Sequence, residues 1–230
     1  RVLRQFDAKA ARGEFWGCDI DETSIAWASD HLSPPFRFFR NDLAPPLELP
    51  GGSLDLVWAM SVFTHISDLW ADWLLELHRL LAPGGVLIAS HLGEGMWEPL
   101  VGDPYMEDDV GMAVLHHADG PDAWVFHSEW WLREHWGRAF EPLALRRPPR
   151  GPDGKPQITH SYIALRRCEV AIGRDELERP NPDEPRELAG LETALRLARM
   201  DIAQLAAGRE GSPQSRLERA ARRLTARPRR

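Results

Sequence analysis

Polar side chains stand at three points of the sequence where a short apolar run gives way to a loop or a helical pattern. In chain order they are Asp19, the pair Asn41 and Asp42, and Ser61. A carboxylate at the tip of a strand, as at Asp19, can accept hydrogen bonds from two neighbouring hydroxyl groups such as those of a ribose. A carboxylate at Asp42 can accept from an adenine amino group, while a nearby backbone N–H donates to a ring nitrogen. The pattern indicates nucleoside binding at the carboxyl ends of strands.

Two histidines, His65 and His91, follow the third and fourth apolar runs. Imidazole titrates near neutral pH, so either ring could take a proton from a hydroxyl nucleophile. His91 is favoured as the base because it directly follows the last of the four runs. The alternative for both is a packed or solvated histidine without a chemical role.

No metal site is predicted. The adjacent His116 and His117 lack an identifiable third ligand, and the two cysteines, Cys18 and Cys168, are far apart in sequence. Two cysteines also provide no disulfide framework, which fits a reducing cytoplasm.

An α/β frame is expected to position these residues. Alternating apolar runs and helical periods predict a doubly wound, mostly parallel sheet, with right-handed crossovers. The parallel strands are predicted at Phe15–Asp19, Phe36–Phe39, Leu54–Met60 and Val86–Ser90. Helices are predicted at Asp21–Leu32, at 67–82 with Ser67 as cap, and at Ser128–Trp136, whereas Gly93–Ala123 is expected to be irregular. Phe140–Arg146 and Ile158–Arg166 are joined by a short Pro/Gly-rich stretch, which predicts an antiparallel hairpin at one edge.

A helical tail follows this domain. Residues 1–168 are the predicted catalytic domain, 169–186 a Pro-rich linker, and 187–230 a helical, Arg-rich tail. Apolar residues in the tail recur at alternating spacings of three and four, a short coiled-coil seam with Glu192 and Arg196 paired on its flank. They are Leu188, Leu191, Leu195, Ala198, Ile202 and Leu205. Such a row must be covered, so a weak homodimer or a partner enzyme is predicted to bind through residues 187–207.

Composition excludes several functional classes. The 230 residues carry a net charge of −7, so the surface as a whole is not suited to nucleic acid or to anionic lipid. Hydrophobic residues make up 43%, enough for a sizeable core, and no apolar run is long enough to span a membrane. A cytoplasmic protein is therefore expected.

Five tryptophans are concentrated between residues 97 and 136. They are Trp97, Trp124, Trp130, Trp131 and Trp136. They could form a packed aromatic core or a platform for stacking sugar rings. Since Trp130 and Trp131 are adjacent on a helix and cannot share a face, at least one of them is expected to be more exposed.

Four segments in order resemble a class I S-adenosylmethionine-dependent methyltransferase. They are Gly17-Cys18-Asp19-Ile20-Asp21, Asn41-Asp42, Gly52-Ser53-Leu54-Asp55-Leu56-Val57 and Leu80-Leu81-Ala82-Pro83-Gly84-Gly85. The resemblance covers residues 1–166 and implies a Rossmann-like fold with S-adenosylmethionine as the cofactor. It also implies that Asp19 holds the ribose, that Ile20 lies beside the adenine, and that Asp42 and Leu43, with Asn41 as a substitute, hold the adenine edge. Ala59, Met60 and Ser61 would lie under the methionine part.

The family's glycine-rich turn has no counterpart in the sequence. The residues Arg1–Phe6 resemble the end of the helix that follows this turn, so the first strand is expected to precede Arg1. Without it, the strands ending at Asp19 and Met60 should be unpaired with each other or collapsed together, and cofactor binding by this chain alone should be impaired.

The expected reaction is methyl transfer to a hydroxyl group of a small molecule or a glycan. The Arg-rich end is weakly similar to coiled-coil tails of bacterial surface-polysaccharide enzymes, which favours a glycan. The main alternative is a catalytically silent scaffold that assembles through its C-terminal helix. A Rossmann dehydrogenase could also use Asp19 for a ribose, but the antiparallel final strand pair argues against it.

Overall fold

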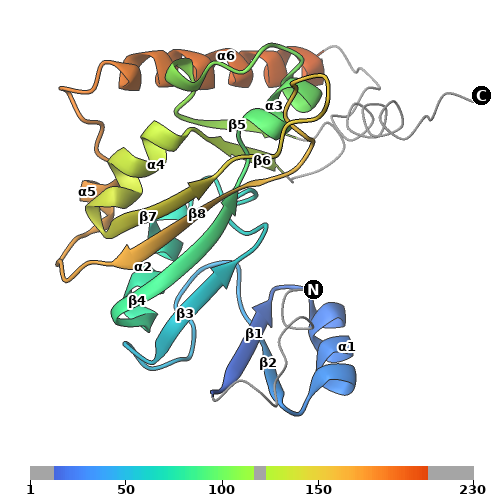
Figure 1. Ribbon diagram of the computed structural model, residues 1–230, viewed down its shortest axis with the longest axis vertical. Coiled ribbons are helices and arrows are strands. Elements are labelled where there is room, and N and C mark those ends of the chain that lie inside the picture. Colours follow the sequence, from blue (N-terminus) through green and yellow to red (C-terminus); the bar gives the residue numbers. More distant parts are fainter. Residues whose placement is uncertain (1–12, 117–122, 207–230) are drawn as a thin grey trace, which may run out of the picture. The chain divides into compact units, whose positions relative to one another are not determined.

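The computed structural model describes residues 13–116 and 123–206, and the chain divides into two compact units, Arg1–Glu48 and Leu49–Arg230. The described part of the first unit holds a two-stranded sheet. The second unit holds a four-stranded sheet and a two-stranded sheet (Figure 1). The Arg-rich end, residues 207–230, lies outside the described residues.

The first unit is a β-α-β element. Strand β1 (Phe15–Asp19) and strand β2 (Phe36–Arg40) are parallel, and helix α1 (Glu22–Leu32) connects them. Asp21 begins the helix as its N-cap, because its carboxylate accepts hydrogen bonds from the Thr23 amide at 3.0 Å and the Ser24 hydroxyl at 2.6 Å. The two strands and the helix predicted for this segment are therefore confirmed.

The large sheet of the second unit has the order β3-β4-β8-β7. Its strands are β3 (Leu54–Ala59), β4 (Leu81–His91), β7 (Phe140–Arg146) and β8 (Ser161–Arg167). The β3–β4 pair is parallel, whereas β8 runs antiparallel to both β4 and β7. The predicted edge hairpin is confirmed. β1 belongs to the first unit and β3 to the second, so the expectation for these two strands stays a prediction.

Helix α2 (Trp70–Leu80) lies between β3 and β4 in the chain and is shorter than predicted. Ser67 is not its cap, since Leu69 occupies that position without a side-chain hydrogen bond. Burial of the Trp70 ring against Trp131, with centroids 5.0 Å apart, accounts for the later start. β4 begins at Leu81, directly after α2. Gly84 adopts φ +74 and turns the chain within β4, not between the helix and the strand.

The segment predicted to be irregular is mostly ordered. It contains helix α3 (Glu94–Val101), a 3₁₀ turn η2 (Glu107–Asp109) and strand β5 (Met112–His116). Strand β6 (Ala123–His127) pairs antiparallel with β5. The prediction failed because β5 and β6 are short strands buried in their own apolar cluster, which includes Trp97 and Phe126.

The tryptophan-rich part forms core and not an exposed platform. Helix α4 (Glu129–His135) is capped by Ser128, whose hydroxyl accepts from the Trp131 amide, and the turn η3 (Trp136–Arg138) follows. Trp130 and Trp131 are both buried, at 5% and 7% exposure. The expectation that one would be exposed is wrong, because Trp130 packs under Arg186 while Trp131 packs on Trp70 and His135.

The predicted linker and tail helix pack onto the second unit as far as they are described. Helix α5 (Arg174–Glu178) buries Leu177, and the carbonyl of Leu177 is 2.7 Å from Nδ1 of His135. Helix α6 (Arg186–Ala206) lies against β5. Its Arg196 pairs with Asp103 at 2.7 Å, not with Glu192 as expected.

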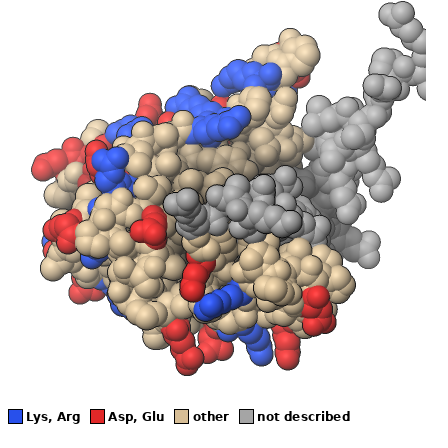
Figure 2. Space-filling view, turned by 60° about the horizontal axis from the view of Figure 1, so that its bottom comes forward, with Lys and Arg blue, Asp and Glu red and all other residues tan. Residues whose placement is uncertain are grey.

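No described helix has the length and apolar character to cross a membrane. Among the described residues no three potential metal ligands cluster. On the face drawn in Figure 2, acidic and basic side chains of the described residues are interspersed.

Candidate cofactor and acceptor site

Five of the predicted cofactor residues lie together at the carboxyl ends of β1 and β2, in the first unit. The backbone N–H of Asn41 donates to the carbonyl of Asp19 at 3.1 Å, which joins the two strand ends. One carboxylate oxygen of Asp19 accepts from the amide of Asp21 at 3.0 Å. Ile20 and Leu43 are 48% and 73% exposed beside these polar groups. A carboxylate between exposed apolar side chains suits a nucleoside, which has hydroxyl donors and a flat apolar ring.

Asn41 and Asp42 form a local turn at this end of the sheet. The Asn41 side-chain amide donates to the carbonyl of Asp42 at 2.8 Å. The Asp42 side chain is exposed, so its carboxylate is accessible to a ligand.

The other three predicted cofactor residues follow β3 in the second unit. Ala59 is buried, and Ser61 has a left-handed backbone with φ +58, which is uncommon for a residue with a side chain. The Ser61 amide donates to the hydroxyl of Ser90 at 2.8 Å, so the ends of β3 and β4 are tied together. Met60 accepts a long hydrogen bond from the hydroxyl of Tyr162, with its sulfur 3.8 Å away. Such strained turns are maintained where the surrounding contacts hold them, frequently at functional sites.

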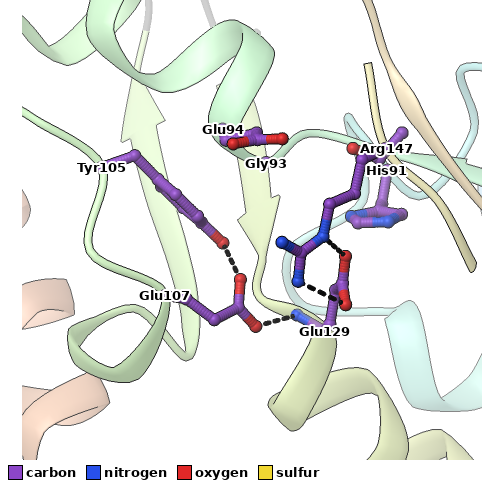
Figure 3. A pocket seen from close by; sticks show the side chains of 8 residues that line it. His91, Gly93, Glu94, Tyr105, Glu107, Glu129 and Arg147 are labelled. Atoms are coloured by element: carbon purple, nitrogen blue, oxygen red, sulfur yellow. Dashed lines mark hydrogen bonds and ion pairs between the residues drawn. The ribbon is translucent and has the colours of Figure 1, made fainter. Parts of the chain in front are cut away.

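The two predicted bases are in different surroundings. His91, at the end of β4, lines a pocket of about 150 Å³ (Figure 3). His65 is exposed, does not line this pocket, and has Nδ1 3.1 Å from the carbonyl of Ala123.

His91 is held in one orientation with one nitrogen unpaired. Its Nδ1 is 3.1 Å from the carbonyl oxygen of His127, an acceptor only, so Nδ1 carries the proton and donates. Its Nε2 is buried without a partner among the described residues. Burial lowers the pKa of His91 to about 4, so the ring is neutral at pH 7 and Nε2 is a hydrogen-bond acceptor.

Three carboxylates also line this pocket. They belong to Glu94 at the start of α3, Glu107 in η2 and Glu129 at the start of α4. Glu129 forms a two-bond ion pair with Arg147, at 2.5 and 3.0 Å, and this lowers the pKa of Glu129. One oxygen of Glu94 accepts from Arg150 at 2.9 Å, while the other is buried without a partner among the described residues.

Glu107 connects the pocket to Tyr105 and to the start of helix α4. Its carboxylate accepts from the Tyr105 hydroxyl at 2.7 Å and from the backbone amide of Glu129 at 2.6 Å (Figure 3). Burial raises the pKa of Glu107 above its ordinary value. Burial likewise raises the pKa of Tyr105, which stays protonated and donates to Glu107.

Sequence reasoning missed every pocket residue except His91. Glu94, Tyr105 and Glu107 come from the segment predicted to be irregular, and Arg147 directly follows β7, in the connection between the two hairpin strands. No spacing rule joins these residues, because the chain brings them together only through the packing of α3, η2 and α4. The one available signal was the acidic residue that directly follows the helix cap Ser128.

Residues 1–89 match the family described as a methyltransferase domain. Several solved structures are similar to the chain. An S-adenosylmethionine-dependent methyltransferase from Mesorhizobium loti is 14% identical, with 69% of this chain and 82% of that chain covered and a TM-score of 0.52. A putative enzyme of the same kind from Listeria monocytogenes is 12% identical over 68% and 80% of the two chains, with a TM-score of 0.51. A chain from the complex of the Haloferax volcanii Trm112 methyltransferase activator with a putative methyltransferase is 14% identical, with 75% and 79% covered and a TM-score of 0.52.

At these identities the solved structures establish the fold. The methyltransferase match covers the unit that carries Asp19 and continues through β3 and most of β4 in the second unit. Residues 1–89 thus match a methyltransferase domain, in a chain whose fold is similar to that of solved S-adenosylmethionine-dependent methyltransferases.

Proposed function

We propose that the protein transfers a methyl group from S-adenosylmethionine to a hydroxyl group of a small molecule or a glycan, and that His91 accepts the hydroxyl proton. The observation that carries the proposal is the unpaired, buried Nε2 of His91 in a pocket lined by carboxylates. A buried acceptor without a partner is costly, and a substrate hydroxyl would supply the missing donor.

The cofactor residues are assigned by their place at the strand ends. Asp19 would accept from the ribose hydroxyls, with Ile20 beside the adenine, and Asn41, Asp42 and Leu43 would hold the adenine edge. Ala59, Met60 and Ser61 would lie under the methionine part. When bound, S-adenosylmethionine supplies a methyl group whose S–C bond breaks as the O–C bond forms, the electron pair leaving on sulfur.

His91 is a weak base, and this is sufficient for the proposed role. A hydroxyl oxygen becomes strongly acidic as it gains a methyl group, so a base with a pKa of about 4 can take its proton late in the reaction. Donation from Nδ1 to the His127 carbonyl keeps Nε2 pointed at the substrate without the ring having to turn. The neutral ring also adds no positive charge to the pocket.

A second unpaired acceptor atom supports a proposal for the chemistry of the methyl acceptor. Glu94, like His91, offers a buried acceptor atom without a partner among the described residues. Two acceptors in one pocket are satisfied together by a molecule with at least two donors. This favours a polyhydroxylated acceptor such as a sugar over a molecule with one hydroxyl group.

The test measures formation of S-adenosylhomocysteine with a panel of glycosides and sugar nucleotides as acceptors. We expect His91→Gln to lower kcat by about 10²–10⁴-fold with unchanged affinity for S-adenosylmethionine. The matched control, His65→Gln, should retain activity because His65 does not line the pocket. The kcat/KM of the unaltered protein should be flat from pH 6 to 8 and fall only near pH 4.

Loss of activity in both variants alike, or in neither, would contradict the assignment of His91. A protein that binds S-adenosylmethionine but methylates no acceptor in the panel would favour the scaffold alternative.

A further inference from the structure

The outer side of α6 carries a continuous row of exposed apolar side chains, here named the α6 stripe. Its members are Leu188, Leu191, Leu195, Ala198, Ile202 and Leu205. The five large residues are between 51% and 68% exposed, which is unusual for neighbouring leucines and isoleucine on one helix. At 1.5 Å per residue the α6 stripe is about 26 Å long.

The opposite side of α6 is fixed to the second unit, so the α6 stripe cannot turn inward. Gly190 approaches Gly111 so closely that a Cβ on Gly190 would lie 3.0 Å from the Gly111 Cα. Buried Asp201 accepts from the backbone amide of His116 at 3.0 Å. Buried Leu197 belongs to the apolar cluster under the helix. Figure 1 shows α6 as the outer layer on this side of its unit, with β5 beneath it.

We propose that the α6 stripe is a dimer interface, which binds the α6 stripe of a second copy of this chain in antiparallel orientation around a twofold axis. The alternating spacing of three and four is that of a two-helix seam, whereas a helix that packs on a globular surface usually has a wider apolar face. In the antiparallel register Leu188 meets Leu205 of the second copy, and Leu191 meets Ile202. Leu195 meets Ala198 at the centre, where the small alanine lets the helices approach.

Charge complementarity selects this orientation. Glu192 and Arg199 are exposed and occupy equivalent flanking positions, each directly after a stripe residue. In the antiparallel register Glu192 of each copy lies beside Arg199 of the other, which gives two attractive pairs. A parallel arrangement would instead place Glu192 near Glu187 of the second copy and leave Arg199 beside Ala194.

One helix per copy is a small interface, so a concentration-dependent dimer is expected and not a permanent one. The two copies use the same surface, and the interface therefore closes on itself without forming fibres. The proposal does not depend on methyl transfer, because no residue of the acceptor pocket or of the predicted cofactor set belongs to α6.

The first test is sedimentation velocity of the full chain over a range of concentrations. We expect the unaltered protein to shift from monomer to dimer as concentration rises, and Leu195→Glu to remain monomeric. The matched control is Ala203→Glu, an exposed position of the same helix outside the α6 stripe, which should dimerise like the unaltered protein. Circular dichroism verifies that each variant is folded, as expected for exposed positions.

The second test exchanges the charges. Glu192→Arg and Arg199→Glu, each alone, should weaken dimerisation by on the order of tenfold, since both flanking pairs become repulsive. The double variant E192R/R199E should restore it. A parallel seam predicts the opposite for Glu192→Arg, because the new arginine would meet Glu187.

Three results would overturn the proposal. These are a protein that is monomeric at every concentration, a dimer that persists in Leu195→Glu, and a double charge variant that dimerises no more strongly than either single variant. The second result would assign the dimer to another surface.

Discussion

At the scale of single residues, two buried histidines, His91 and His127, are joined by one hydrogen bond beside the pocket that His91 lines. His91 donates to the carbonyl of His127, while both ring nitrogens of His127 are buried without a partner among the described residues. Burial lowers the pKa of His91 to about 4 and that of His127 to about 3. Both rings are therefore neutral in the folded protein over the physiological range.

Because of these pKa values, the free energy of unfolding depends on pH. An unfolded chain binds protons at both histidines below about pH 6.5, but the folded chain does so only near pH 4 and below. The free energy of unfolding is therefore constant above pH 6.5 with respect to these groups, and falls as the pH is lowered from 6.5 towards 4.

His127→Leu should flatten this acid dependence. The variant removes a group that the unfolded chain protonates, so the loss of unfolding free energy between pH 7 and pH 5 should shrink by about 2 kcal/mol. Urea unfolding at the two pH values measures it. An unchanged difference between the two pH values would mean that His127 is hydrated or already charged in the folded state.

Variants of Asp19 and Asp21 distinguish a role in ligand binding from a role in helix capping. Asp19→Ala should weaken calorimetrically measured binding of S-adenosylmethionine by at most about 1.5–3 kcal/mol for each hydrogen bond lost. Asp21→Ala is the matched control, because Asp21 caps α1, and it should lower stability with little change in binding. Equal affinities of the Asp19 variant and the unaltered protein would reduce Asp19 to a structural role.

One rule, a polar side chain at the carboxyl end of a strand, predicts both His91 and Asp19 as site residues. The structure has both residues at such ends, of β4 and β1, while their roles stay predictions. Glu107 and Arg147 could not be identified this way, because their proximity depends on how η2 and the end of β7 pack, and no local spacing encodes that packing.

At the scale of elements, α6 depends on two glycines for its position. A Cβ on Gly190 would lie 3.0 Å from both the Cα and the amide nitrogen of Gly111, and neither backbone atom can move away cheaply. Gly190→Ala should therefore destabilise the protein by about 1–3 kcal/mol in chemical denaturation, through a displaced α6.

The control for this variant is Gly137→Ala, where a Cβ would meet no atom within 4 Å. It should leave stability unchanged or raise it slightly, since alanine restricts the unfolded chain. Similar losses in the two variants would mean that the Gly190 contact does not hold the helix.

The elements predicted best from sequence are those with clear local signals. The cap at Asp21 begins α1, and the Pro/Gly-rich stretch before β8 produces the edge hairpin. The start of α2 was missed because tertiary burial of Trp70 and not a cap determines it. The spacing of the apolar residues on α6 correctly predicts one face of a helix. It does not predict the face that packs on the second unit, because Gly190, Leu197 and Asp201 do not form a hydrophobic pattern.

At the scale of the whole molecule, the two units differ in how much core they contain. Among the described residues of the first unit, α1 and β1 have no buried side chain, and Phe36 and Leu47 are the buried apolar ones. The second unit contains the large apolar cluster and the buried tryptophans. Local stability follows buried apolar contacts, so the units should open at different free energies.

Hydrogen exchange followed by mass spectrometry should resolve this difference. Backbone amides of residues 13–48 should exchange faster than those of β4, whose strand is paired on both edges. S-adenosylmethionine should slow exchange around Asp19 if the proposed cofactor residues bind it. Equal protection of the two units in the absence of cofactor would contradict the expected difference in their local stability.

The position of β8 between β4 and β7 has a consequence for protein synthesis. β4 gains its second neighbouring strand only when Ser161–Arg167 has been synthesised, about 70 residues after the end of β4. This takes about 4–14 s at ordinary elongation rates, and the second edge of β4 stays unpaired until then. During that interval the nascent chain carries an unpaired, largely apolar strand edge that other chains can capture. Slowing translation between β4 and β8 should therefore lower the yield of native protein, whereas the same pause after Arg167 should not.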